Sequence, residues 1–258
     1  MVYLTIPSVS LHVRQKPQSD HGVTGRNTAL TKRTFTDLNR LMLKCIIYEQ
    51  APAKYQTEFH RTRSTNPSDL SRKLDSVSKP KTYQFARTFK QKNLLDWDDE
   101  GFFFPNIEVL LERWLAAERE VPIEKFPVQS LFGKSFDEVV RRATSQSVGY
   151  AVAGFEGCQF HGKLYASSPV RPELYVFDDI RRAINELEVG HAEPHNADFW
   201  LLRPKYETSI VEELRFDADK IQYVDLLQAA LDTIHHPQRG KEQAEFIMDT
   251  VVRWVENE

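Results

Sequence analysis

Apolar side chains between residues 32 and 118 recur mainly at helical spacing. In the first part of this stretch Leu41, Met42 and Cys45 share one face, which predicts an amphipathic helix after a cap at Thr31. The same spacing continues along the chain, each time after a residue that caps helices or fits their first turn. The pattern predicts helices at residues 32–49, 68–74, 79–92 and 107–118.

Two short apolar runs follow the third of these helices. Leu94–Trp97 and Phe102–Phe104 are predicted to pair as two strands joined by a tight turn at residues 98–101. We expect their aromatic side chains to pack in the core of the hairpin rather than to stack on bases. The succession of helix, loop, helix, four-residue connector, helix and hairpin is typical of a winged helix-turn-helix unit.

The pattern changes after residue 118. Residues 119–130 contain two prolines and are interpreted as an interdomain linker. Beyond them helices and strands alternate, and residues 155–166 stay open between helix and strand. Helices are predicted at 136–145, 179–188, 220–231 and 242–255, and strands at 149–153, 173–177 and 199–202.

These elements together predict an α+β fold in which an N-terminal winged helix-turn-helix domain is followed by a mixed α/β domain. Residues 1–30 are polar, poorly periodic and partly basic, so we interpret them as a flexible arm. The expected organisation is an arm at 1–30, a DNA-binding domain at 31–118, a linker at 119–130 and an acidic α/β domain at 131–258.

The composition of the chain limits the classes of protein to which it can belong. The chain has 258 residues, 41% of them hydrophobic and 28% charged, which is an ordinary globular mixture long enough for a full core. We expect no membrane span, because no apolar run approaches the length that one requires, and no secretory signal. The only two cysteines, Cys45 and Cys158, lie far apart and favour a reducing, cytoplasmic setting, with Cys45 an inert core thiol.

Charge divides the chain into two unequal parts. Residues 1–95 hold 17 Lys and Arg against 6 Asp and Glu, a net charge of +11, whereas residues 96–258 hold 17 against 31, a net charge of −14. A basic unit of this size suits a polyanion partner, because neutralised phosphates release counterions. The alternative is a basic arm joined to an acidic domain, with no nucleic acid involved.

The third predicted helix has the residues of a recognition helix. Thr82, Phe85, Ala86 and Phe89 share a face that should pack inward. On the other face Arg and Gln can bond bidentately to guanine and adenine edges, while Lys, Tyr and Ser position phosphates. The residues expected to contact DNA on or beside this helix are Ser78, Lys79, Lys81, Tyr83, Gln84, Arg87, Lys90 and Lys92.

The predicted wing departs from the usual pattern. Its turn carries Asp98, Asp99 and Glu100, which phosphates would repel. We therefore assign the remaining backbone contacts to the basic loop at 50–66 rather than to the wing. The loop residues expected to neutralise phosphates are Lys54, Arg61 and Arg63. A three-helix unit that binds protein instead of DNA remains an alternative.

Several segments of the chain resemble abortive-infection type IV antitoxins of the AbiEi-like family. The similarity covers residues 32–255, with Gln238-Arg239-Gly240 in place of the more usual Gly-Arg-Gly. The segments that carry it are Leu110–Trp114, Val148–Gly154, Pro172–Val176, Phe199–Pro204, Ile221–Leu227 and Gln238–Ala244.

This resemblance implies a specific function. Such proteins are antitoxins and autorepressors, whose winged helix binds inverted repeats in double-stranded operator DNA. Their C-terminal domain is associated with countering a nucleotidyltransferase-like toxin without a tight complex. The oligomeric state is not implied.

Enzyme chemistry has weaker support in the sequence. Glu173 with Asp178 and Asp179 suggests a metal-dependent nuclease, which we keep as the alternative function, but no Lys shares the strand of Glu173. The two aspartates are explained more simply as helix caps. Cys158 and His161 give half of a zinc site without a second pair. We expect no catalytic residue, cofactor or metal.

Arg239 is the candidate functional residue of the C-terminal half. It lies in a Gly-containing turn between two predicted helices. In one interpretation it is a cation that satisfies free carbonyls at a helix end. In the other it contacts an RNA, a nucleotide or the toxin.

Overall fold

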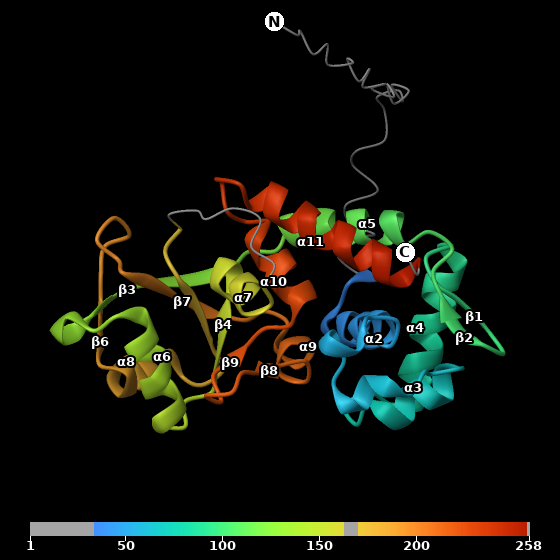
Figure 1. The fold of residues 1–258 in the computed structure, drawn as a ribbon, viewed down its shortest axis with the longest axis horizontal. Helices are drawn as coiled ribbons and strands as arrows, with labels where there is room; N and C mark the ends of the chain where they lie inside the picture. The colour runs from blue at the N-terminus through green and yellow to red at the C-terminus, as the bar shows by residue number, and fades with distance from the viewer. Residues whose placement is uncertain (1–33, 163–169, 257–258) are drawn as a thin grey trace, which may run out of the picture.

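The computed structural model describes residues 34–162 and 170–256, so the arm at 1–30 and the cap at Thr31 lie outside the described residues. Figure 1 shows the N-terminal helices and a small hairpin at one end of the molecule and a large sheet flanked by helices at the other. The predicted α+β class is confirmed.

Three of the four N-terminal helices begin within one residue of their predicted starts, but the helix predicted at 32–49 begins only at Asp37, after Thr36 at its N-cap position, so its predicted start is wrong. Asn66 and Asn106 cap two of them, accepting hydrogen bonds from Ser68 N at 2.9 Å and Val109 N at 2.9 Å. Ser78 occupies the N-cap position of the third, but its side chain makes no capping bond. The helices are α2 (Asp37–Tyr48), α3 (Pro67–Lys73), α4 (Lys79–Gln91) and α5 (Ile107–Arg119), with short 3-10 turns η1 (Ala53–Tyr55) and η2 (Glu58–Arg61) between α2 and α3.

The hairpin follows α4 as predicted, with strands β1 (Asp96–Asp98) and β2 (Gly101–Phe103) pairing antiparallel. Phe102 is buried in the core, but Phe103 is 38% exposed, so the prediction that all these aromatic side chains pack inward is wrong for Phe103. Successive residues of a strand face opposite sides, and only one side of this hairpin meets the helices.

The sheet of the C-terminal half has seven strands in the order β6-β3-β7-β5-β4-β9-β8. Its long strand β3 pairs antiparallel with both β6 and β7. The strands are β3 (Glu124–Ser130), β4 (Tyr150–Ala153), β5 (Glu173–Val176), β6 (Val189–His191), β7 (Phe199–Arg203), β8 (Arg215–Phe216) and β9 (Gln222–Tyr223).

The interpretation of residues 119–130 as a linker is wrong for most of its length, because residues 124–130 form β3. Pro127 argued against a strand, since it has no amide hydrogen to donate. Its carbonyl accepts from Ala192 N at 3.1 Å, just beyond the last residue of β6. The nitrogen of Pro127, which has no hydrogen to donate, therefore faces the position just beyond the end of β6.

Helices cover both faces of the sheet. α6 (Phe136–Ser145) and α8 (Ile180–Leu187) pack on one face, and α7 (Gly154–Phe160) and α10 (Leu226–Thr233) on the other. The second of these cores is continuous with the core of the N-terminal helices and includes α11 (Gly240–Val255). The two halves of the chain thus share one hydrophobic core.

In two segments the structure decides what the sequence pattern left open or predicted wrongly. Residues 155–166, left open between helix and strand, contribute residues 155–160 to α7. The helix predicted at 220–231 is wrong in its first part, where residues 222–223 form β9 and Asp225 caps a helix that begins at Leu226. The Asp225 side chain accepts from Gln228 N at 3.0 Å, and this cap sets the start of α10.

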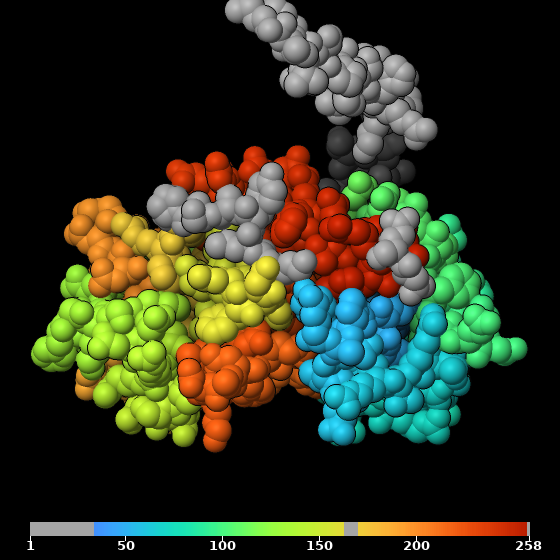
Figure 2. Space-filling view, viewed as in Figure 1, coloured from blue at the N-terminus to red at the C-terminus, as the bar shows by residue number. Residues whose placement is uncertain are grey.

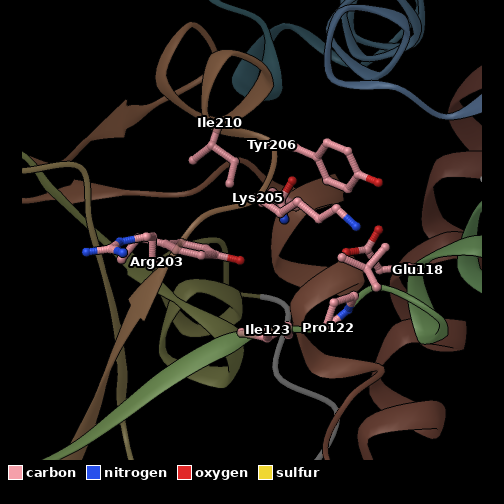
Figure 3. Close-up of a pocket in the computed structure, with 10 residues that line it drawn as sticks. Glu118, Pro122, Ile123, Arg203, Lys205, Tyr206 and Ile210 are labelled. Carbon is pink, nitrogen blue, oxygen red and sulfur yellow. The ribbon is translucent and has the colours of Figure 1, made fainter.

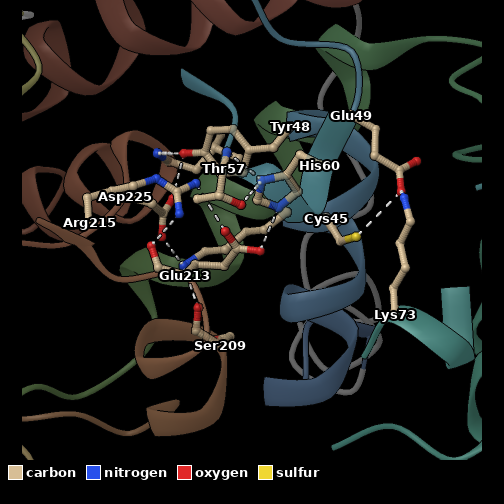
Figure 4. Close-up of polar contacts among 12 residues, drawn as sticks. Cys45, Tyr48, Glu49, Thr57, His60, Lys73, Ser209, Glu213, Arg215 and Asp225 are labelled. Atoms are coloured by element: carbon tan, nitrogen blue, oxygen red, sulfur yellow. Dashed lines mark hydrogen bonds and ion pairs between the residues drawn. The ribbon is translucent and has the colours of Figure 1, made fainter. Parts of the chain in front are cut away.

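A buried polar cluster joins α2 to the C-terminal half (Figure 4). Lys44 is fully buried and donates to Asp225 Oδ2 at 2.6 Å, Gln228 Oε1 at 3.1 Å and Ser209 O at 2.8 Å. Tyr48 donates to the other Asp225 oxygen at 2.8 Å. Ser209 belongs to α9 (Glu207–Val211), a short helix that packs on α2. Polar contacts therefore fix the N-terminal helices against the sheet.

Candidate nucleic-acid interface

The third helix of the N-terminal group, α4, has one buried and one exposed face. The predicted inward set is confirmed, since Thr82, Phe85, Ala86 and Phe89 are all at most 1% exposed. α4 packs on α3 and touches β1 at one end of the molecule, and Figure 2 shows cyan and teal N-terminal residues at the surface there. Of the predicted contact residues on or just before this helix, Lys81 is half-buried and the exposed ones are Ser78, Lys79, Tyr83, Gln84, Arg87 and Lys90.

Some of the predicted contact residues already have partners within the protein. Tyr83 Oη lies 2.9 Å from Ser68 Oγ, and Lys90 donates to Asp96 at 2.6 Å. Lys92 is half-buried and donates to Thr34 Oγ1 at 2.7 Å. Burial, and then the charge of Arg113, lowers the pKa of Lys92. Lys92 therefore points into the protein rather than toward a ligand.

Among the cationic side chains of the loop at residues 50–66, one also has a hydrogen-bond partner within the protein. Lys54, Arg61 and Arg63 are all exposed, with the Lys54 ammonium 4.9 Å from the centre of the Tyr55 ring. Arg63 donates to Phe102 O at 2.8 Å and lies against Gly101 in the hairpin. Gly101 has a φ of 123°, which side chains rarely adopt, and an added Cβ would lie 3.0 Å from the backbone oxygen of Ser64 as well as 2.9 Å from Arg63 Nε. Arg63 anchors the hairpin.

The hairpin turn next to α4 is acidic, as its sequence requires. Asp98, Asp99 and Glu100 are all exposed, and Asp98 accepts from Glu100 N at 2.8 Å. Each carboxylate therefore faces solvent beside the cationic helix. The cationic residues exposed or half-buried on α4, Lys79, Lys81 and Arg87, therefore belong to the same part of the fold as an anionic turn, since α4 packs beside β1.

The carboxylates of the nuclease alternative have structural partners. Glu173 is 2% exposed and accepts from Lys125 at 2.6 Å, while His236 Nε2 lies 3.1 Å from its other oxygen. Burial opposes its ionisation, but His236 and Lys125 outweigh that effect and lower the pKa of Glu173. Lys125 lies on β3, a strand that the sequence pattern did not predict. A search for a Lys on the same strand as Glu173 therefore could not find it.

The remaining acidic candidates serve the backbone. Asp179 caps α8 as expected, accepting from Arg181 N at 2.9 Å, but the expected cap is wrong for Asp178, which accepts instead from Gly149 N at 2.7 Å. Among residues 34–162 and 170–256, no three His, Cys, Asp or Glu side chains are grouped to hold a metal ion. His161 lies with Nε2 2.9 Å from Val224 O, a satisfied packing contact.

A small cavity lies where α5 meets the end of β7 (Figure 3). Glu118, Lys205 and Tyr206 line one side of it and Arg203 the other. Its volume is about 20 Å³, which is room for one water molecule rather than for a nucleotide. Glu118 pairs with the buried Arg40, so the cavity borders an ion pair between α5 and α2.

Arg239 lies at the amino end of α11, as its N-cap residue, with a left-handed φ of 55°. The side chain of Arg239 is exposed, and within the described residues it donates to no carbonyl at the end of α10, so the structure gives no support to its interpretation as a cation on free helix carbonyls. Gly240 explains the turn: a Cβ there would overlap the carbonyl oxygen of Thr233. Gly240 thus allows the start of α11 to pack closely against the end of α10.

Gly240→Ala should destabilise the protein by about 2–3 kcal/mol, because the added methyl group meets backbone that cannot move away cheaply. Arg239→Ala removes an exposed side chain and should change the free energy of unfolding by less than about 0.5 kcal/mol. Urea unfolding of both variants measures this. Equal losses would show that the guanidinium of Arg239, not the close approach at Gly240, holds the turn.

Comparison with known protein families, with characterised proteins and with solved structures finds no match for this chain. Within the described residues, no helix combines the length and the apolar character that crossing a bilayer requires.

Proposed function

We propose that this protein is a double-stranded DNA-binding transcriptional regulator that inserts α4 into the major groove. The observation that carries the proposal is the exposed polar face of α4, which projects Lys79, Gln84 and Arg87 away from the shared core. Arg and Gln are the residue types that read guanine and adenine edges. The order of helices and hairpin around α4 supports assignment of this unit as a winged helix.

The proposed roles follow from the positions of the side chains. Gln84 and Arg87 read base edges, while Ser78, Lys79, Lys81 and Tyr83 contact phosphates beside the groove. Lys54 and Arg61 neutralise phosphates from the loop that precedes α3. The acidic turn of the hairpin stays away from the duplex, so the wing makes no minor-groove contact. Lys90, Lys92 and Arg63 position the fold.

The resemblance to AbiEi-like antitoxins supports a narrower role. On that basis the protein would be a cytoplasmic antitoxin that represses its own operon at inverted repeats and counters a nucleotidyltransferase-like toxin without binding it tightly. The acidic C-terminal half would limit nonspecific coating of DNA, because it repels phosphates beyond the bound face. A toxin gene adjoining this one would support this role.

Arg87→Ala should cost about 1–3 kcal/mol at a cognate site and little on random duplex, because only base contacts distinguish sequences. Lys54→Ala should weaken binding to all duplexes alike and reduce the salt slope by about 1. Fluorescence-anisotropy titrations at several salt concentrations, with duplexes from the region upstream of the gene, measure both effects.

Lys220→Ala is the matched control, since Lys220 is exposed between β8 and β9 in the C-terminal half. Its affinity for DNA should equal that of the unmodified protein. Equal losses for Arg87→Ala on cognate and random DNA would remove Arg87 from the base-reading residues. Absence of duplex binding at low salt would overturn the proposed function.

The nuclease alternative has one observation in its favour, the Lys125 ammonium beside Glu173. Both oxygens of Glu173 are already engaged, so a metal would have to displace Lys125 or His236. Incubation with labelled DNA and RNA plus Mg²⁺ or Mn²⁺ tests this alternative. Metal-dependent cleavage that is lost in Glu173→Gln would favour it.

A further inference from the structure

Each of the three cationic side chains in the loop at residues 50–66 directly adjoins a buried residue of the same loop. The pairs of an exposed cation and a buried neighbour are Lys54 with Tyr55, Arg61 with His60, and Arg63 with Ser64. Because neighbouring residues share a short piece of backbone, whatever holds the buried member also determines where the cation is held. The contacts of the three buried residues therefore decide which part of the protein positions each cation.

Two of the three buried residues bind elements of the C-terminal half. Ser64 stays within the N-terminal half, where its N and Oγ donate to the Glu49 carboxylate at 2.9 Å and 2.7 Å. The Tyr55 ring instead packs on Trp254 of α11, with ring centres 4.5 Å apart. His60 lies 3.1 Å through Nε2 from Oε1 of Glu213, a residue between α9 and β8. The C-terminal half thus holds the neighbours of Lys54 and Arg61.

The hydrogen bonds of His60 fix the state of its ring. Thr57 N lies 3.2 Å from Nδ1, and a backbone N–H group can only donate, so Nδ1 accepts. Nε2 then carries the ring hydrogen and donates it to Glu213 (Figure 4). His60 and Glu213 are each 1% exposed, so water does not compete for this bond. A neutral imidazole therefore links the loop to a buried carboxylate of the other half.

Glu213 is itself held in place from its other side. Its Oε2 accepts from Arg215 Nη2 at 3.1 Å, and the Arg215 guanidinium lies 4.9 Å from the centre of the Tyr48 ring. The same Tyr48 ring lies 5.4 Å from the ring of His60. Both oxygens of Glu213 are therefore engaged, and His60 donates to an acceptor whose position is fixed. Hydrogen bonds to a charged acceptor are among the strong ones in proteins.

We infer that the C-terminal half positions Lys54 and Arg61 for contact with phosphates, through Trp254 and Glu213. The phosphate contacts rest on the proposed function, whereas the positioning of the loop is independent of it. A loop without these two anchors would have to be ordered at the moment of binding, which costs affinity. The acidic half of the chain thus contributes to DNA affinity although its own net charge is negative.

Two substitutions of His60 separate its two hydrogen bonds. Asn places an amide oxygen where the ring has Nδ1, so His60→Asn keeps an acceptor for Thr57 N but cannot reach Glu213. Gln places an amide N–H group close to the position of Nε2, so His60→Gln still donates to Glu213. If His60 acts only within its own turn, Gln is the more harmful change. If it anchors the loop to the C-terminal half, Asn is the more harmful change.

Hydrogen exchange followed by mass spectrometry tests the positioning without DNA. In His60→Asn the amides of residues 57–62 should exchange about tenfold faster or more, because a buried acceptor has lost its donor and the loop opens more often. In His60→Gln they should exchange nearly as slowly as in the unmodified protein. Trp254→Leu is a second variant that changes no residue of the loop, and it should speed exchange at residues 53–56.

Titration of random and cognate duplexes at several salt concentrations tests the consequence for binding. His60→Asn should reduce the salt slope by about 1, as the loss of one phosphate contact does, and leave the preference for cognate DNA unchanged. Made in Arg61→Ala, the same substitution should not reduce the slope further, since the cation that it positions is already absent. A general loss of stability would not depend on Arg61 in this way.

His236→Asn is the matched control, because His236 Nε2 lies 3.1 Å from Glu173 Oε2, the same distance as in the His60 pair, but wholly within the C-terminal half. It should change neither the exchange of residues 53–62 nor the salt slope.

Three results would overturn the inference. They are unchanged exchange in both His60→Asn and Trp254→Leu, a larger effect of His60→Gln than of His60→Asn, and a slope that His60→Asn still reduces in Arg61→Ala. Faster loop exchange in His60→Asn, together with no duplex binding by the unmodified protein, would contradict the proposed function alone.

Discussion

Lys44→Met should lower the free energy of unfolding by about 3–5 kcal/mol, because it leaves the Asp225 carboxylate buried without its cation. Burial opposes ionisation of Asp225, but the charges of Lys44 and Arg215 outweigh it and lower the pKa of Asp225. In Lys44→Met the charge of Lys44 is gone. Chemical denaturation followed by tryptophan fluorescence measures the loss.

Two further variants separate the buried charge from other effects. Lys90→Met breaks an ion pair with Asp96 whose side chains are 52% and 29% exposed, so it should cost less than about 1 kcal/mol. Lys44→Met combined with Asp225→Asn should be more stable than Lys44→Met alone, since Asn is neutral and still caps α10. Additive losses in the double variant would show that the pair is not coupled.

Glu156→Gln should stabilise the protein by about 3 kcal/mol at neutral and higher pH. Burial, with a further contribution from the charge of Glu173, raises the pKa of Glu156 to about 7, and its Oε2 has no hydrogen-bond partner among the described residues. The folded protein thus holds a proton that the unfolded chain releases near pH 4.3. Its free energy of unfolding therefore falls as pH rises from about 4 to about 7.

In Glu156→Gln this fall should be much smaller. Burial also raises the pKa of Asp232 to about 6, so part of the slope below that pH should remain. Glu138→Gln is a control of opposite sign. Hydrogen bonds from the backbone and the hydroxyl of Ser135 lower the pKa of Glu138, so the ionised carboxylate stabilises the fold. Above about pH 4 the Glu138→Gln variant should therefore be less stable than the unmodified protein. Urea titrations from pH 4 to pH 8 compare the three proteins. An unchanged slope in Glu156→Gln would contradict the assignment.

The apolar spacing of the first half of the chain predicted its helices to within a few residues. Phe85, Ala86 and Phe89 determine the buried face of α4, so the exposed face followed from the sequence as well. Local patterns succeed here because each helix buries a face written in its own residues. The partners of that exposed face did not follow. Nothing near Lys92 or Arg63 in the sequence indicates Thr34 or Phe102 as their acceptors.

The C-terminal half was predicted less completely. A strand as short as β6, with three residues, shows little periodicity of its own. The longer strand β3 contains a proline, which argued against a strand. The resemblance to antitoxins rests on short segments, and Gln238–Gly240 proved to be a packing turn between α10 and α11. The role of the C-terminal half stays a prediction.

The sequence by itself determined the α+β class, the helices that surround α4 and the contrast between a basic front and an acidic rear. These features depend on residues close together along the chain or on simple sums of charge. Only the tertiary structure decided that Lys44 meets Asp225 and that Lys125 meets Glu173. Such contacts join residues tens to hundreds of positions apart, and their energies depend on burial that no local pattern encodes.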